Sequence, residues 1–92
     1  MQHRVTVLYF GGLKEALHCA QDTVSLDEGQ TRIIDLYERL CQRHGRLPTL
    51  LTHVRIALNE EFLEGVGQIP LRSDVTLTEG DVVAFIPPVT GG

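Results

Sequence analysis

The strongest constraint on the fold is one amphipathic helix that has strand-like segments on both sides of it. Residues 31–44 predict this helix, because Thr31 is a suitable N-cap and Gly45 a suitable residue just after the last turn. Five apolar residues recur within it at helical spacing and predict one buried stripe: Ile33, Ile34, Tyr37, Leu40 and Cys41. One stripe covers one face of a sheet, so the pattern predicts a two-layer α+β domain.

The segments that flank the helix have the β-branched and aromatic composition of strands. We expect strands at residues 4–10, 23–26, 54–58 and 82–86, a short strand or bridge at 75–77 and a helical turn at 13–18. The first two strands are expected to be antiparallel neighbours. A short right-handed crossover places the first and last strands together as a central parallel pair. The predicted architecture is a roll, with a mixed sheet of about five strands and one main helix packed on one face.

The size and composition of the chain argue against several classes of function. Its 92 residues suffice for one small domain, which has little wall with which to enclose a catalytic pocket. The net charge is −4, the eight Lys and Arg residues are scattered and Trp is lacking, so we expect no nucleic-acid binding. No apolar run approaches the ~20 residues of a membrane span, and no signal peptide is recognisable. Two cysteines without a C-x-x-C pair are typical of the reducing cytoplasm, where we expect the protein.

The last strand leads into a segment in which prolines favour an extended chain and glycines add no side-chain bulk. Proline lacks an amide donor and ends a strand, and glycine can thread a channel too narrow for a Cβ atom. We therefore divide the chain into a domain at residues 1–86 and an extended tail at residues 87–92. The tail consists of Pro87, Pro88, Val89, Thr90, Gly91 and Gly92.

Such a tail is suited to deliver the α-carboxylate of Gly92 to a distant site. A carboxylate has a pKa near ~3.5, is ionised at neutral pH, and is a poor electrophile until it is activated. The segment from Gly11 to Lys14 lacks the spacing and the hydroxyl of a phosphate-binding loop, so activation must come from a partner enzyme.

The segment 79–92, which ends in Pro-Pro-Val-Thr-Gly-Gly, closely resembles the C-terminus of the small subunits of molybdopterin synthase (MoaD-like, in the MoaD/ThiS family). Residues 7–10, the pair Lys14-Glu15 and residues 57–59 are also similar to that family. The resemblance covers nearly the whole chain and implies a β-grasp, ubiquitin-like fold. Two departures are a longer segment at 63–73 and Lys14 at a position where arginine is familiar.

The resemblance also implies a function, that of a sulfur carrier. Gly92 would become an acyl-adenylate and then a thiocarboxylate, which passes sulfur to cyclic pyranopterin monophosphate and so forms the dithiolene of molybdopterin. Gly91 would be a slim spacer, and no cofactor would stay bound. The implied partners are the large catalytic subunit, in a heterotetramer, an E1-like adenylylating enzyme, and a sulfurtransferase or cysteine desulfurase.

Three other functions stay open at this stage. A carrier for thiazole synthesis or tRNA thiolation would use the same chemistry, although such relatives usually lack the Pro-Pro-Val-Thr lead. A ubiquitin-like modifier would instead be conjugated to lysines. A plain binding module would carry the two terminal glycines incidentally.

A surface for a partner is predicted on the face of the sheet opposite the helix. Strand alternation places Leu8 and Phe10 on this face together with Ala84 and Ile86, and Phe62 can join them. A face open to water should be polar, so these apolar residues predict a partner contact, unless a loop covers them.

The remaining candidate residues have simpler interpretations. Cys41 and His44 stand three apart on one helix and could supply two metal ligands, but no second pair follows at zinc-site spacing. We therefore expect no metal site, with Cys41 in the core and His44 at the helix end. Cys19 is expected to be an ordinary thiol.

Overall fold

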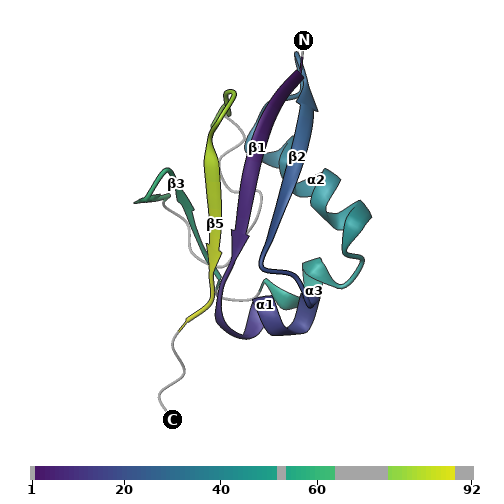
Figure 1. Ribbon diagram of the computed structural model, residues 1–92, viewed down its shortest axis with the longest axis vertical. Helices are drawn as coiled ribbons and strands as arrows, with labels where there is room; N and C mark the ends of the chain where they lie inside the picture. Colours follow the sequence, from purple (N-terminus) through teal and green to yellow (C-terminus); the bar gives the residue numbers. More distant parts are fainter. Residues whose placement is uncertain (1, 52–53, 64–74, 89–92) are drawn as a thin grey trace.

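The five strands of the described chain form one mixed sheet, and the longest helix packs against one of its faces (Figure 1). The computed structural model describes residues 2–51, 54–63 and 75–88. The elements follow in the order β1 (Gln2–Tyr9), α1 (Gly11–Leu17), β2 (Gln21–Asp27), α2 (Ile33–Arg43), α3 (Leu47–Leu50), β3 (Arg55–Leu58), β4 (Glu61–Phe62) and β5 (Val82–Ile86).

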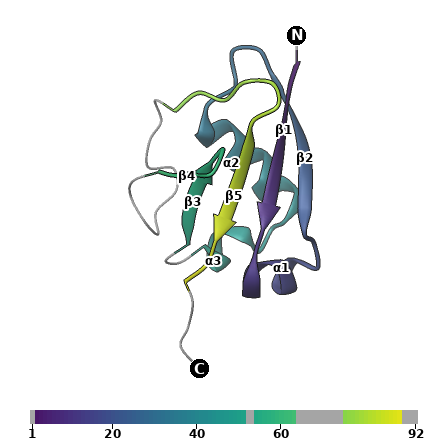
Figure 2. The same ribbon diagram turned by 60° about the vertical axis from the view of Figure 1, so that its left-hand side comes forward.

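The strand order across the sheet is β2-β1-β5-β3-β4. β1 and β5 are parallel and central, while β1–β2, β3–β5 and β3–β4 are antiparallel. The predicted central parallel pair is thus confirmed, as is the antiparallel pairing of the first two strands. Figure 2 shows α2 behind β1 and β5, so that the opposite face of these strands is turned away from the helices. We call this opposite face the open face.

Alternation along β1 decides which side chains form the core. Val5, Val7 and Tyr9 point toward α2 and are almost completely buried, whereas their neighbours on the open face are only partly covered. α2 contributes Leu36 and Leu40 to the same core, and β5 contributes Val83 and Phe85. This two-layer packing is the one expected from a single apolar helix stripe.

The start of α2 differs from the prediction. The helix begins at Ile33, and Thr31 is not its N-cap, because the backbone of residues 31–33 forms a bridge to residues 75–77. The amide of Leu77 donates to the carbonyl of Thr31 over 2.7 Å. The carboxylate of Asp35 accepts the amide hydrogen of Arg32 instead, over 3.0 Å, and so serves the helix start.

The buried stripe of α2 also differs in part. Ile33, Leu36 and Leu40 are buried, whereas the predicted members Ile34, Tyr37 and Cys41 are half-buried at the edge of the contact. The centre of the contact therefore lies on the line through Leu36, which the prediction omitted. Cys41 does pack against the core, as expected.

Several elements have other bounds than predicted. The first strand ends at Tyr9 rather than residue 10, and α1 is a helix of seven residues instead of one turn. The short helix α3, with Pro48 near its first position, was not predicted. Most of the predicted loop at 63–73 lies outside the described residues. No helix within the described ranges has the length and apolar character needed to cross a membrane.

Candidate functional site

One row of side chains crosses the open face and includes four strands. Leu8 pairs with Ala84, Ala84 pairs with Ala57, and Ala57 pairs with Phe62. Residues that pair across neighbouring strands project to the same face of a sheet, so these four side chains lie side by side. The face contains two alanines at its centre, on β5 and β3, between larger apolar residues.

These alanines form the floor of a shallow apolar groove with a volume of about 530 Å³. Its lining residues are Leu8, Phe10, Ala57, Asn59, Glu60, Phe62, Val82, Ala84 and Ile86. Within the described residues, Phe10 and Phe62 are the exposed large hydrophobic side chains, at 44% and 49% exposure. The structure therefore brings all five predicted partner-binding residues to one groove, while their role in binding stays a prediction.

Arg55 adds a positive charge to this face and was missed by sequence reasoning. Its guanidinium carbon lies 3.7 Å from the centroid of the Phe62 ring, a cation–π contact. Arg55 pairs with Ile86 in the sheet, so it projects to the open face. Alternation within β3, where Arg55 and Ala57 share a face, was the signal that could have identified it.

A tight turn between β3 and β4 positions Phe62 at the edge of the groove. Asn59 and Glu60 both have positive φ angles, of 50° and 72°, as the two-residue type I′ hairpin turn requires. The Asn59 side chain accepts the amide hydrogen of Val82 and donates to the carboxylate of Asp81. These bonds tie the turn to the start of β5 and so hold the groove edge in place.

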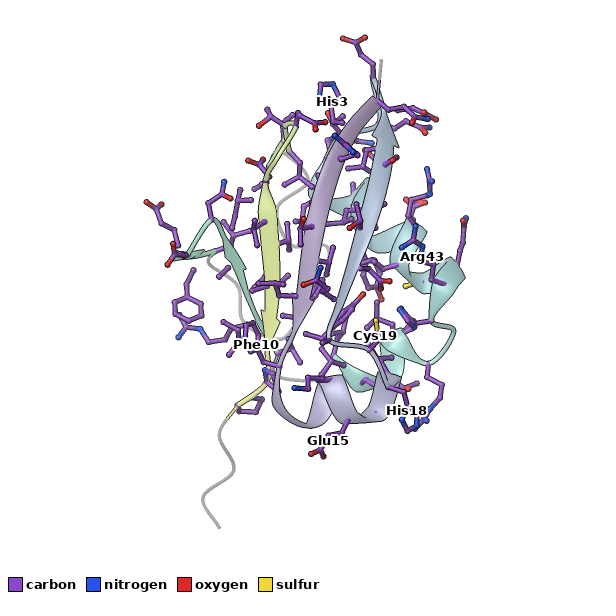
Figure 3. The ribbon with its side chains drawn as sticks, in the orientation of Figure 1. His3, Phe10, Glu15, His18, Cys19 and Arg43 are labelled. Carbon is purple, nitrogen blue, oxygen red and sulfur yellow. The ribbon has the colours of Figure 1, made fainter. Side chains whose placement is uncertain are left out.

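The beginning of the predicted tail packs against the beginning of α1. Gly11 has a φ of +55°, and a Cβ atom there would lie 3.3 Å from Cγ of Pro87. Pro87 and Pro88 follow β5 outside the sheet, as their missing amide donors predict. Figure 3 shows Phe10 near the end of β5, where this segment leaves the domain. The predicted tail residues Val89, Thr90, Gly91 and Gly92 lie outside the described residues.

A polar cluster lies on the helix side of the sheet, where β2 begins and α2 ends. The Tyr9 hydroxyl donates to Oδ2 of Asp22 over 2.8 Å, and Nε2 of His44 lies 2.8 Å from the same oxygen. Arg43 donates from Nη1 to Oδ1 of Asp22 over 3.3 Å. The rings of Tyr9 and His44 are edge to face, with centroids 5.8 Å apart.

Charge and burial oppose each other in this cluster. Burial raises the pKa of Asp22, but the hydrogen bonds from His44 and Tyr9 and the charge of Arg43 outweigh burial and hold this pKa below its usual value. Burial, and then the hydrogen bond to Asp22, raise the pKa of the Tyr9 hydroxyl far above its usual value. Asp22 is therefore a carboxylate and Tyr9 a neutral donor at neutral pH.

Cys19 joins His44 in this cluster, whereas sequence reasoning had considered Cys41 beside His44. The Sγ atom of Cys19, a carboxylate oxygen of Asp22 and a ring nitrogen of His44 all lie within 4.8 Å of one another. His44 does end α2, as predicted, with its amide donating to the carbonyl of Leu40. Sequence reasoning missed this trio because more than twenty residues separate His44 from Cys19 and Asp22, and tertiary packing alone joins them.

A mixed sheet with this strand order, one long helix on one face and an apolar groove on the other defines a ubiquitin-like β-grasp domain. The chain belongs to the ThiS family, whose model matches residues 7–92. The resemblance to the MoaD/ThiS family and the predicted fold class are thus confirmed.

The relatives of the chain are similar to it over almost their full length. The molybdopterin synthase sulfur carrier subunit of Mycobacterium tuberculosis is 34% identical over 90 residues, which cover 97% of this chain and 98% of that protein. A solved structure shows the complex of subunits 1 and 2 of the molybdopterin-converting factor of Helicobacter pylori. One chain of that complex matches with a TM-score of 0.62 and 26% identity, over 97% of this chain and 99% of that chain.

The fold is also similar to that of proteins not named as molybdopterin synthase subunits. The crystal structure of SAMP1 from Haloferax volcanii has a TM-score of 0.76, with 97% of this chain and 99% of that chain covered. At 23% identity, this likeness concerns the fold alone.

Proposed function

We propose that this chain is the sulfur carrier subunit of a molybdopterin synthase. In this function it donates sulfur and is consumed in each cycle, while the acid–base groups and the substrate pocket belong to a large catalytic subunit. The proposal places the protein in the cytoplasm. Its support from comparison is the match to relatives that carry this name, one of them at 34% identity.

The observation that carries the proposal is the position of the groove relative to the tail. Ile86 lines the groove, and the next residue, Pro87, begins the tail. A partner that fills the groove would therefore hold the carrier at the point where the tail starts. Docking at this point would aim the tail into the partner's active site, which is the positioning that a tethered reactant needs.

The chemistry would take place on the carboxylate of Gly92. An E1-like enzyme would transfer AMP from ATP to this carboxylate and release pyrophosphate. The terminal sulfur of a persulfide on a sulfurtransferase or cysteine desulfurase would then displace AMP and form an acyl disulfide. A second thiol would reduce this disulfide, forming a new disulfide with the donor cysteine and leaving a thiocarboxylate on Gly92. The thiocarboxylate sulfur, which is anionic and polarizable, would attack a side-chain carbon of cyclic pyranopterin monophosphate and displace an oxygen substituent there. Water would then hydrolyse the resulting thioester, which leaves the sulfur on the pterin and restores the carboxylate of Gly92.

Two measurements test this proposal on the full chain. The intact mass of protein isolated from its own cells should include a species in which one oxygen is replaced by sulfur. Loss of that species in a strain without the adenylylating enzyme would support activation by a partner. A carrier that never gains sulfur under these conditions would contradict the proposal.

The second measurement identifies the pathway. The tagged chain should co-purify with a pterin-binding large subunit, and the thiocarboxylate form should convert cyclic pyranopterin monophosphate to molybdopterin in that complex. Co-purification with thiazole synthase or a tRNA-thiolating enzyme would instead select the other carrier function. Isopeptide-linked adducts on lysines of other proteins would select a ubiquitin-like modifier.

A further inference from the structure

The cluster on the helix side of the sheet contains three different metal-ligating atoms. We propose that Cys19, Asp22 and His44 form a binding site for one divalent transition-metal ion of the zinc class. Cys19 follows α1, Asp22 lies in β2 and His44 ends α2, so three separate elements each supply one ligand. Their ligand atoms lie within 4.8 Å of one another. This proposal does not depend on the proposed sulfur-carrier function.

The donor set is one that favours zinc over the hard ions. Thiolate sulfur, imidazole nitrogen and carboxylate oxygen all bind Zn²⁺ at about 2.0–2.3 Å, commonly in a tetrahedron. Magnesium and calcium prefer oxygen ligands, so a sulfur and a nitrogen argue against them. Three protein ligands leave the fourth position to water. The 2.8 Å separation between His44 and Asp22 must widen to roughly 3.5 Å, the spacing of ligand atoms in such a tetrahedron.

The hydrogen bonds around Asp22 suit a carboxylate that binds metal through one oxygen. Arg43 donates to Oδ1, so Oδ2, the oxygen that lies 2.8 Å from Nε2 of His44, is the one that would bind the ion in place of its contact with His44. The Tyr9 hydroxyl also donates to Oδ2 and helps to hold the carboxylate in place. Such partners of the ligands raise metal affinity, and their loss alone typically weakens it about 10–100-fold.

The charges and protons of the site balance. Cys19 binds as a thiolate, so the bond between sulfur and metal forms as the thiol proton passes to water. His44 binds through Nε2 as neutral imidazole with a proton on Nδ1, so the Nε2 proton that bonds to Asp22 in the ion-free cluster leaves Nε2, to Nδ1 or to water. The two negative charges of Cys19 and Asp22 offset the two positive charges of the ion, and Arg43 stays paired with Asp22.

The location of the site separates it from the groove. Asp22 pairs with Val7, which is a core residue and therefore projects to the helix side of the sheet. Figure 3 shows Cys19 and Arg43 together on the flank near α2, apart from Phe10. A bound ion would fasten the ends of α1 and α2 to the start of β2 without covering the proposed docking surface.

Titration of the reduced, metal-free full chain with Co²⁺ tests the proposal. We expect one ion per chain, a charge-transfer band from thiolate to cobalt in the near ultraviolet, and the strong visible bands of a tetrahedral site. Zn²⁺ should displace Co²⁺, raise the melting temperature and protect Cys19 from alkylation, as mapped by peptide mass. The alkylation map does not depend on a variant that folds.

Matched variants locate the ligands. Cys19→Ser should abolish the charge-transfer band, and His44→Gln should weaken Co²⁺ binding about a hundredfold or more, since a lost ligand costs at least as much as a lost partner of a ligand. Cys41→Ser, on the same helix as His44, and His18→Gln, next to Cys19, should leave binding unchanged. The proposal is overturned by weak cobalt bands without charge transfer, or by a band that survives in Cys19→Ser and disappears in Cys41→Ser.

Discussion

Tyr9 and Phe10 are neighbours in the chain, yet their side chains serve opposite sides of the sheet. Tyr9 is buried on the helix side, where its ring stacks on Phe85 and its hydroxyl bonds to Asp22. Phe10 is 44% exposed and lines the groove on the open face. Single substitutions at adjacent positions can therefore separate stability from partner binding.

Replacing Phe10 by alanine should weaken binding to the proposed large subunit more than it weakens the fold. Loss of a buried aromatic anchor in an interface costs about 2 kcal/mol or more, which corresponds to roughly thirtyfold in affinity. Unfolding of the free chain should change much less, because the exposed ring leaves little cavity behind. Calorimetric titration with the large subunit and denaturant unfolding of the free chain measure the two effects.

Val7→Ala is the matched control for the Phe10 variant, because Val7 is fully buried on the helix side of β1, the strand that Phe10 directly follows. It should cost about 1–2 kcal/mol of unfolding free energy through the cavity it leaves, with affinity nearly unchanged. Equal behaviour of the two variants would contradict the assignment of faces.

The Tyr9 hydroxyl should contribute measurably to stability through its bond to Asp22. Tyr9→Phe retains the ring contacts with Phe85 and His44 but removes a hydrogen bond to a charged acceptor, so we expect a loss of about 1.5 kcal/mol. Urea unfolding of the two proteins gives this difference directly. An unchanged midpoint would show that water replaces the hydroxyl at no cost.

At the scale of elements, the junction between β1 and α1 supports the start of the tail. Gly11 adopts a left-handed backbone conformation and lies against Pro87, whereas Gly12 has an ordinary φ and no atom near its missing Cβ. Only one of these two adjacent positions therefore requires glycine. The first is required by conformation and by contact, and the second by neither.

Gly11→Ala should destabilise the chain by about 1–2 kcal/mol, because a left-handed conformation is unfavourable for a residue with a Cβ. The new methyl group would also press on Pro87, so sulfur transfer should slow at saturating large subunit. Gly12→Ala should instead stabilise the chain by about 0.5 kcal/mol, since alanine favours helix. Thermal unfolding and a sulfur-transfer assay of both variants test this prediction. Equal changes in stability and in transfer rate for the two variants would show that Gly11 has no special role.

The sequence predicts elements well where one periodicity dominates and poorly where tertiary pairing decides. Alternation in the first and last strands identified the core residues of those strands and four of the five expected groove residues. Phe62 was expected there from its position after the turn at Asn59. The N-cap at Thr31 was wrong, because the backbone there forms an isolated bridge with residues 75–77, more than forty residues away. Alternation within β3 could have placed Arg55 on the open face, but its contact with Phe62 joins two strands. The cluster around Asp22 joins residues from separate elements, so spacing along the chain contained no signal for it.

The whole molecule keeps its proposed activities apart. The groove lies on the open face, the polar cluster lies on the helix side, and Pro87 begins the tail at one end of the central strand β5. In Figure 1 this end of β5 lies near α1, far from the N-terminal end of β1. A carrier built in this way can dock through a folded face while its reacting end acts at a distance.

Substitutions in the tail should therefore lower the activity of the carrier without lowering the stability of its fold. Gly91→Leu should leave the unfolding midpoint unchanged, because glycine has no side chain whose packing the substitution could remove. It should lower adenylylation and pterin conversion by about a hundredfold or more, since displacing a reacting group by even 1 Å can cost that much. Thermal unfolding and the pterin conversion assay are run together, with Thr90→Ser as a tail variant that adds no bulk. Full activity of Gly91→Leu would show that no narrow channel receives the tail, and a lowered midpoint would show that residue 91 packs against the domain.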